Sequence, residues 1–342
     1  MGRDDARPVS HDTLFSCYST TKGVAAAALH LLVDRGQIDY EAPVAKYWPE
    51  FAANGKGEVT VAQAMSHQAG LHTTPVPGLP YILDWNKGVS YVAGLAPALT
   101  PGTATGYHAI TYGWIVGGIV QGATGRHIKD VIAQELAKPL GLANEMYVGI
   151  PEGVDDRLAT LEPGPPANPD PLAGLPPDHD VFKAMPLNLG VDFNDPAVRR
   201  ACLPSANGHF TARAIARLYG ALANGGEVDG VRLVSKARIA EMNRQRTNQV
   251  DRALRLPIPK AVGFWLGGNW LFGGIPSFMG PRSTAFGHPG RGGSAGWADP
   301  EIGLSVGVTV NRLQPSIFGM GIAFDVGRLV REEVSRRDGL SS

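Results

Sequence analysis

Ser19 and Lys22 lie three positions apart at the start of a stretch of helix-forming residues that extends to about Arg35. Residues at this spacing share one face of a helix, so both side chains face one site. A serine hydroxyl becomes a nucleophile when a nearby base takes its proton, and lysine is such a base once burial lowers its pKa. The pair therefore predicts nucleophilic serine chemistry. The alternative is an N-cap serine followed by a solvated lysine.

Three further segments come after this pair in a fixed order. Residues 66–71 read SHQAGL, residues 106–109 read GYHA, and residues 286–290 read FGHPG. Together with residues 12–23, DTLFSCYSTTKG, they resemble the four active-site motifs of class C β-lactamases and their esterase relatives. On these motifs the chain is identified as a member of the β-lactamase and penicillin-binding-protein superfamily. It is most similar to the family VIII carboxylesterases.

The resemblance implies a role for each residue at a matching position. Ser19 would attack the substrate carbonyl, while Lys22 and Tyr107 would share its proton and return it to the leaving group. The backbone N–H groups of Ser19 and Arg291 would form the oxyanion hole. Gly290, which has no side chain, would let a substrate pass close to its strand.

Two positions depart from the lactamase pattern. The third motif begins with His288, where lactamases have a lysine that helps bind the substrate carboxylate. The second motif has Ala109 in place of an asparagine that contacts the lactam side-chain amide. Both departures favour an ester substrate. His288 is a candidate site residue, and the alternative is a histidine that is merely hydrogen-bonded at a strand end.

We therefore expect a serine hydrolase that cleaves short-chain carboxylic esters through an acyl-enzyme on Ser19. A β-lactamase or a D-amino-acid peptidase is the first alternative. A non-catalytic scaffold on the same fold is the second, because fold alone does not give function. The expected partner is a small-molecule ester, and the oligomeric state stays open.

A second serine, Ser294, lies in the sequence Gly-Gly-Ser-Ala-Gly of residues 292–296. This matches the Gly-x-Ser-x-Gly elbow of α/β-hydrolases, which requires a sharp turn from a strand into a helix. Residues 300–303 instead read as a hairpin turn before a second β-like run. The pattern predicts that Ser294 is not the nucleophile.

Composition narrows the class of protein further. The 342 residues contain 31 Lys plus Arg and 31 Asp plus Glu, so no electrostatic feature predicts binding to nucleic acid. Two cysteines, Cys17 and Cys202, are too few for a disulfide framework, and the histidines lack metal-ligand spacing. We expect neither metal nor cofactor. No apolar run reaches the length of a membrane span and no signal peptide is visible, which predicts a cytoplasmic protein.

The order of predicted elements indicates an α+β fold, with an antiparallel sheet flanked by helices and an inserted, mostly helical region. The sheet domain is expected to combine residues 1–50 and 250–342, and the helical domain to span residues 51–249 with a proline-rich loop at 163–186. Helices are expected near residues 19–35, 61–65, 110–124, 127–138, 211–219 and 324–336, and strands near residues 264–266, 285–288, 294–299 and 304–311.

The first ten residues are polar and show no apolar alternation. The family places strands before the nucleophile helix, and this segment does not supply them. We therefore expect a chain that begins late, and a sheet whose strands come mainly from residues 260–312. Such a sheet would expose an unpaired edge.

Overall fold

The computed structural model describes residues 1–73, 78–165, 174–185, 190–315 and 321–338. The proline-rich loop predicted at 163–186 falls partly outside these ranges. Its described end differs from the prediction, because α7 (Asp180–Ala184) is a short helix. No proline occurs between residues 178 and 185, and the His179 side chain accepts the N–H of Val181 to cap the first turn.

The main sheet is an antiparallel meander of four strands that follow one another in both sequence and space, as predicted. Short turns join the last three strands, which is the connection that antiparallel neighbours allow. The strands are β6 (Trp265–Leu266), β7 (Phe286–Pro289), β8 (Ala295–Asp299) and β9 (Leu304–Val308).

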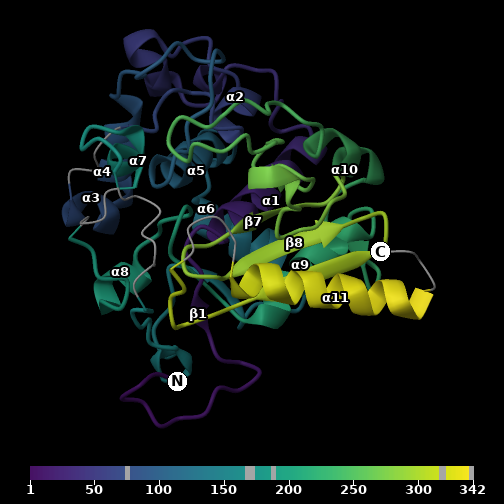
Figure 1. Cartoon of the computed structure of the whole chain (residues 1–342). Helices are drawn as coiled ribbons and strands as arrows, with labels where there is room; N and C mark the ends of the chain where they lie inside the picture. The colour runs from purple at the N-terminus through teal and green to yellow at the C-terminus, as the bar shows by residue number, and fades with distance from the viewer. Residues whose placement is uncertain (74–77, 166–173, 186–189, 316–320, 339–342) are drawn as a thin grey trace.

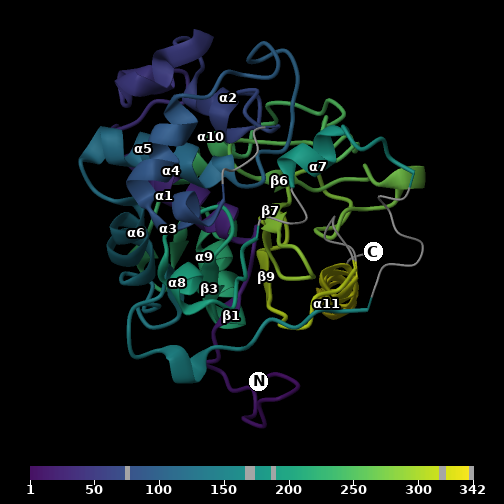
Figure 2. The ribbon, with the colours of Figure 1, turned by 90° about the vertical axis from the view of Figure 1, so that its left-hand side faces the viewer.

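Helices cover both faces of this sheet, and Figure 2 shows the sheet between α9 and α11. On one face, Gly296 of β8 pairs with Gly307 of β9, and helix α9 (Ala212–Ala223) packs against both strands. A Cβ at Gly307 would lie 2.3 Å from a backbone oxygen of α9, so only glycine permits this approach. Neighbouring Trp297 faces the other side. There Arg331 of α11 (Ile322–Asp338) lies over its ring, and α11 crosses the strands in Figure 1.

The helical part is built around two helices that are buried on nearly all sides, α1 (Thr21–Asp34) and α5 (Thr111–Thr124). Both were predicted. The predicted helix at 127–138 is α6 (Ile128–Val131), which continues as a π-type helix over Ile132–Ala137. The remaining helices are α2 (Val61–Met65), α3 (Leu79–Leu83), α4 (Trp85–Ala93), α8 (Pro196–Arg200) and α10 (Lys236–Met242), and the 3₁₀ turns are η1 (Val44–Lys46), η2 (Pro49–Gly55), η4 (Asp155–Arg157) and η5 (Phe272–Gly274).

Two small sheets were not predicted, because strands of two or three residues show no recognisable alternation. A hairpin joins β4 (Glu227–Val228) to β5 (Val231–Arg232). The other sheet has the order β1-β3-β2, and its central strand brings together three distant parts of the chain. Its members are β1 (Phe15–Ser16), β2 (Met146–Val148) and β3 (Gly208–Phe210).

The α+β class and its antiparallel sheet are confirmed. Among the described residues, β1 is the strand that precedes Ser19, and it pairs with β3 rather than with the main sheet. The four strands of the main sheet come from residues 265–308, within the predicted range, and β9 lies at one edge of the sheet. The division into two domains stays a prediction. Helix α9, from the segment assigned to the helical domain, packs on the main sheet.

Candidate active site

The segment before Ser19 is held in place by the β1-β3-β2 sheet. The Cys17 N–H donates to the Gly208 carbonyl at 2.9 Å, and Tyr18 forms a parallel bridge with Asn207. Tyr18 has a φ of +43°, a left-handed conformation that is uncommon for a residue other than glycine. The turn places Ser19, which is half-buried, at the head of α1. A strained residue at this point is typical of a functional site.

Lys22 is completely buried, and its Nζ contacts three oxygen atoms. These are Ser19 Oγ at 3.0 Å, the Ala109 carbonyl at 2.7 Å and the Ser205 carbonyl at 2.8 Å. Burial holds the pKa of Lys22 well below its ordinary value of 10.5. A neutral amine has two N–H groups, which the two carbonyls accept. Its lone pair is then left to accept the Ser19 hydroxyl proton.

Tyr107 lies across from this pair. Its phenol is hydrogen-bonded to Ser19, and its ring centroid lies 4.9 Å from Lys22 Nζ. Burial raises the pKa of Tyr107 above its ordinary value, since an anionic phenolate is poorly solvated there. The phenol therefore keeps its proton and can donate it. Of the two residues expected to share the serine proton, Lys22 is the one whose pKa shift favours accepting it.

His288 fits both alternatives that the sequence analysis left open: it is hydrogen-bonded at a strand end, and it lies beside the candidate site. Its Nδ1 lies 2.7 Å from the Pro289 carbonyl at the end of β7, and its ring stacks on Tyr107 with centroids 6.0 Å apart. Burial holds the pKa of His288 well below its ordinary value, so the ring is neutral. Since a carbonyl only accepts, Nδ1 carries the proton. Nε2 is then an acceptor, and it has no partner among the described residues.

The end of β7 meets the nucleophile segment at Gly290. A Cβ there would lie 2.3 Å from the Cys17 carbonyl and 2.8 Å from Thr20 Oγ1, so only glycine fits. Neither the Ser19 N–H nor the Arg291 N–H donates a hydrogen bond within the described part of the chain. Both donors are therefore available to a ligand, and their role as the oxyanion hole stays a prediction. The Arg291 side chain is exposed.

The loop over residues 66–71 supports Tyr107 through a histidine that the sequence analysis did not single out. The backbone carbonyl of His67 accepts the Gly106 N–H at 3.0 Å. The Nδ1 atom of the His67 ring accepts the backbone N–H of His108 at 3.1 Å. The rings of His67 and Tyr107 lie 5.0 Å apart. The motif SHQAGL was the available signal for His67. A further residue that bonds the Tyr107 backbone, Asp251, had no sequence signal, because it lies 144 positions away.

Ser294 is 1% exposed, and its Oγ accepts the Val310 N–H at 3.2 Å. The strand β8 begins at the next residue, and a turn and β9 come after it. The prediction that no helix follows Ser294 is confirmed. The hydroxyl hydrogen-bonds within the sheet and lacks the strand-to-helix turn of a nucleophile elbow.

Metal ligands and membrane spans are absent from the part of the chain that the structure describes. Across those residues, no group of three or more His, Cys, Asp or Glu side chains is placed to hold a metal ion. No helix among them is long and apolar enough to cross a membrane. Cys17 and Cys202 are both free thiols, and burial raises the pKa of each to about 12.

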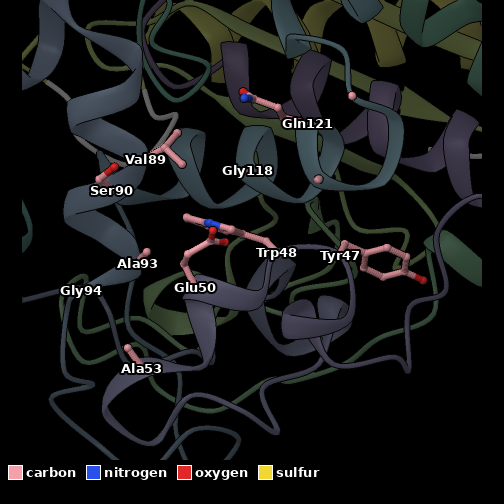
Figure 3. A pocket seen from close by; sticks show the side chains of 12 residues that line it. Tyr47, Trp48, Glu50, Ala53, Val89, Ser90, Ala93, Gly94, Gly118 and Gln121 are labelled. Carbon is pink, nitrogen blue, oxygen red and sulfur yellow. The ribbon is translucent and has the colours of Figure 1, made fainter.

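A separate hollow of about 660 Å³ lies between η2, α4 and α5, and Figure 3 shows its lining. Trp48 and Gly118 form part of its wall, with Glu50 and Gln121 as polar groups. None of its lining residues belongs to the cluster around Ser19. It is therefore separate from the serine and lysine pair.

A buried lysine paired with a serine at the head of a helix, beside an antiparallel sheet, defines a serine hydrolase of the β-lactamase fold. The β-lactamase family model matches residues 2–322, so the chain belongs to that family. The resemblance expected from the motifs is confirmed. The chain is also 35% identical over 329 residues to the esterase/beta-lactamase LipL of Mycobacterium tuberculosis, which covers 90% of this chain and 71% of that protein.

Two solved structures are similar over nearly the whole chain. A family VIII carboxylesterase is 39% identical with a TM-score of 0.84, covering 97% of this chain and 85% of the other. A penicillin-binding protein homolog from Caulobacter crescentus is 36% identical with a TM-score of 0.86, covering 96% and 86%. Both confirm the fold that the helices and antiparallel strands define.

Proposed function

We propose that this protein hydrolyses short-chain carboxylic esters through an acyl-enzyme on Ser19. The observation that carries the proposal is the 3.0 Å contact between Ser19 Oγ and the buried Lys22, whose pKa burial holds well below its ordinary value. Such an amine is a base available at neutral pH, which a solvated lysine is not. The names of the similar esterases support the same reaction class.

Acylation begins when Ser19 Oγ bonds to the ester carbonyl carbon and its proton passes to Lys22. The carbonyl oxygen becomes an anion, which the N–H groups of Ser19 and Arg291 would stabilise. As the carbon–oxygen bond to the alcohol breaks, Tyr107 donates its proton to the leaving oxygen. The proton held by Lys22 then restores the phenol, and the free alcohol departs.

Deacylation repeats these steps with water in place of the alcohol. The water loses a proton to Lys22 as it attacks the acyl carbon, and Ser19 Oγ regains a proton as it leaves. The products are a carboxylic acid and the original enzyme. Each step uses groups already within contact of Ser19, so no metal or cofactor is required for the proton balance.

The choice of esters over lactams depends on two side chains. The neutral His288 ring supplies no positive charge for a substrate carboxylate, because burial keeps it unprotonated. Ala109 supplies no amide for an acylamino side chain, and its carbonyl is already bonded to Lys22. A small ester without a carboxylate needs neither contact. The alternatives to this proposal are a β-lactamase, a D-amino-acid peptidase and a non-catalytic scaffold, and the experiments below distinguish them.

The nucleophile is tested by Ser19→Ala, with Ser294→Ala as the matched serine control. We expect Ser19→Ala to abolish hydrolysis of p-nitrophenyl butyrate and labelling by a fluorophosphonate, whereas Ser294→Ala keeps a substantial part of both. Intact mass spectrometry would locate the label. A wild-type protein that neither hydrolyses the ester nor takes the label would establish the scaffold alternative instead.

The substrate class is tested by p-nitrophenyl esters of increasing acyl length, measured beside a chromogenic cephalosporin. We expect kcat/KM to be far higher for the short esters, because His288 and Ala109 provide no lactam contacts. A D-alanyl peptide substrate separates the peptidase alternative. A cephalosporin with a higher kcat/KM than the butyrate ester would show that the substrate assignment is wrong.

A further inference from the structure

Tyr107 belongs to no helix or strand, because α5 begins only at Thr111. Its position therefore depends on contacts with other parts of the chain. One of these is a hydrogen bond of 3.1 Å from the Tyr107 N–H to Asp251 Oδ1. A second, of 2.9 Å, joins the Arg252 N–H to the Thr105 carbonyl. The segment around Asp251 thus holds the backbone on which Tyr107 is carried.

Asp251 is fully buried and uses both oxygens. Oδ1 accepts the N–H groups of Ala253 at 2.9 Å and Leu254 at 3.0 Å in addition to that of Tyr107. Oδ2 forms an ion pair with Lys260 Nζ at 3.0 Å, where both side chains are at most 1% exposed. Three N–H groups and the Lys260 ammonium together fix the position of this carboxylate.

Lys260 is fixed in turn by the sheet. Its backbone forms bridges with Thr247 and with Trp265, the first residue of β6. The Trp265 ring packs edge-on against Tyr107, with centroids 6.0 Å apart. Burial lowers the pKa of Lys260 while the Asp251 carboxylate opposes that shift. The lysine therefore joins the turn at 251–254 to the sheet edge that faces Tyr107.

We infer that Asp251 and Lys260 form a positioning pair that holds Tyr107 against Ser19. Because each of the two side chains neutralises the charge of the other, neither leaves an unpaired charge beside the site. The inference rests on the proposed function, since it gives Tyr107 a part in proton transfer. Within the described part of the chain, neither side chain of the pair forms a hydrogen bond or ion pair with Ser19 or Lys22. The pair acts through the Tyr107 backbone and through its charge balance.

Charge balance is necessary because the carboxylate and the ammonium act on the site with opposite signs. The Asp251 carboxylate raises the pKa of Tyr107, and the Lys260 ammonium lowers the pKa of His288. Together they nearly cancel at a distance. Removal of one partner leaves a buried charge without compensation, which is costly, whereas removal of both charges is tolerated far better.

The test compares Asp251→Asn, Lys260→Met and the double variant. Asp299→Asn is the matched control, since Asp299 is also buried and paired, with Arg282 at 3.2 Å in the sheet. kcat and KM for p-nitrophenyl butyrate are measured below the Tm of each variant and normalised to fluorophosphonate-labelled sites. We expect each single variant of the pair to lower kcat about 10–100-fold with KM changed less than about threefold, and Asp299→Asn to keep both.

The double variant provides the result that a purely structural role would not give. The amide oxygen that Asp251→Asn introduces can still accept the Tyr107 N–H, so this backbone contact survives the loss of the charge. We expect kcat to recover at least about tenfold over either single variant, as coupled neighbours do. In Lys260→Met the acid limb of the kcat profile should move to higher pH, because the unscreened carboxylate favours protonated Lys22. In the double variant the acid limb should return to the pH at which it lies in the wild type.

Two results distinguish the possible failures. A wild-type enzyme without label or ester hydrolysis would reject the proposed function itself. A labelled, active wild type whose Asp251→Asn and double variants both keep the wild-type kcat and pH profile would overturn only the positioning pair. If one single variant fails to fold, the kcat and the acid limb of the other single variant, compared with those of the double variant, decide the question.

Discussion

Two completely buried lysines, Lys22 and Lys56, each place Nζ among three oxygen atoms, yet in different surroundings. Lys56 contacts only backbone carbonyls: Ala53 at 2.5 Å, Ala93 at 3.0 Å and Leu95. Three carbonyls require three N–H donors, so this site fits an ammonium. The Ala93 and Leu95 carbonyls lie at the C-terminal end of α4, where the helix dipole also favours a cation.

Lys22 differs from Lys56 in one of its three oxygen partners and in lying at the start of a helix rather than near the end of one. One of its three oxygens is the Ser19 hydroxyl, which can donate as well as accept. It also lies at the start of α1, where the helix dipole disfavours a positive charge. Burial lowers the pKa of Lys56, but it holds the pKa of Lys22 well below the ordinary value. Burial lowers the pKa of both lysines, but only Lys22 contacts a hydroxyl group whose proton it could accept.

The largest effect expected from this difference is on catalysis. Lys22→Met should lower kcat/KM for a short ester by about 10²–10⁴-fold, the usual contribution of a general base. The variant should still fold, because methionine has a similar volume and removes a desolvated amine, although the Ala109 and Ser205 carbonyls lose their donor. Ester kinetics and a thermal melt on the same preparation check both parts. Activity within about threefold of the wild type would remove Lys22 from the mechanism.

A pair of glycines extends the comparison to the backbone. A Cβ at Gly290 would lie 2.3 Å from the Cys17 carbonyl beside the nucleophile, and a Cβ at Gly122 would lie 2.1 Å from the Tyr47 carbonyl near the second lysine. Each alanine variant should cost about 1–3 kcal/mol of stability through overpacking. Only Gly290→Ala should also lower kcat, by up to about 100-fold, since it displaces the nucleophile segment. Equal activity in both variants would contradict this distinction.

The pH dependence is set by the lowered pKa of Lys22. Activity requires the neutral amine, so kcat/KM should rise about tenfold per pH unit on the acid limb and level off once Lys22 loses its proton. The plateau should begin well below pH 10.5. The unfolded chain binds the proton more tightly, so this group makes stability rise with pH between its folded and unfolded pKa values. Urea unfolding of wild type and Lys22→Met at two pH values isolates that contribution.

The smallest effect on catalysis is expected at the second lysine. Lys56→Met leaves three carbonyls without their donor and should lower the free energy of unfolding by about 1–3 kcal/mol. Below its Tm, the variant should keep the kcat, KM and acid limb of the wild type. Denaturant unfolding and ester kinetics measure the two quantities separately. A displaced acid limb would show that Lys56, too, is coupled to the site.

The sequence by itself determined the elements whose signals are local. The Ser19 and Lys22 spacing placed both residues on one helical turn, and the four strands of the main sheet were bounded to within a few residues. The motif at Tyr107 and the glycine at Gly290 were also identified from short segments. The exclusion of Ser294 as nucleophile depended only on the turn and strand residues that come directly after it in the chain.

Only the tertiary structure decided which chemical state each group takes. The sequence singled out Lys22 by its spacing from Ser19, but the pKa of a lysine depends on burial and on partners from distant segments, which only the fold supplies. Lys22 obtains Ala109 and Ser205, 87 and 183 positions away, and Tyr107 obtains Asp251, 144 positions away. The β1-β3 pairing that fixes the nucleophile turn is equally non-local. Sequence thus identified the reacting side chains, and packing set their protonation and orientation.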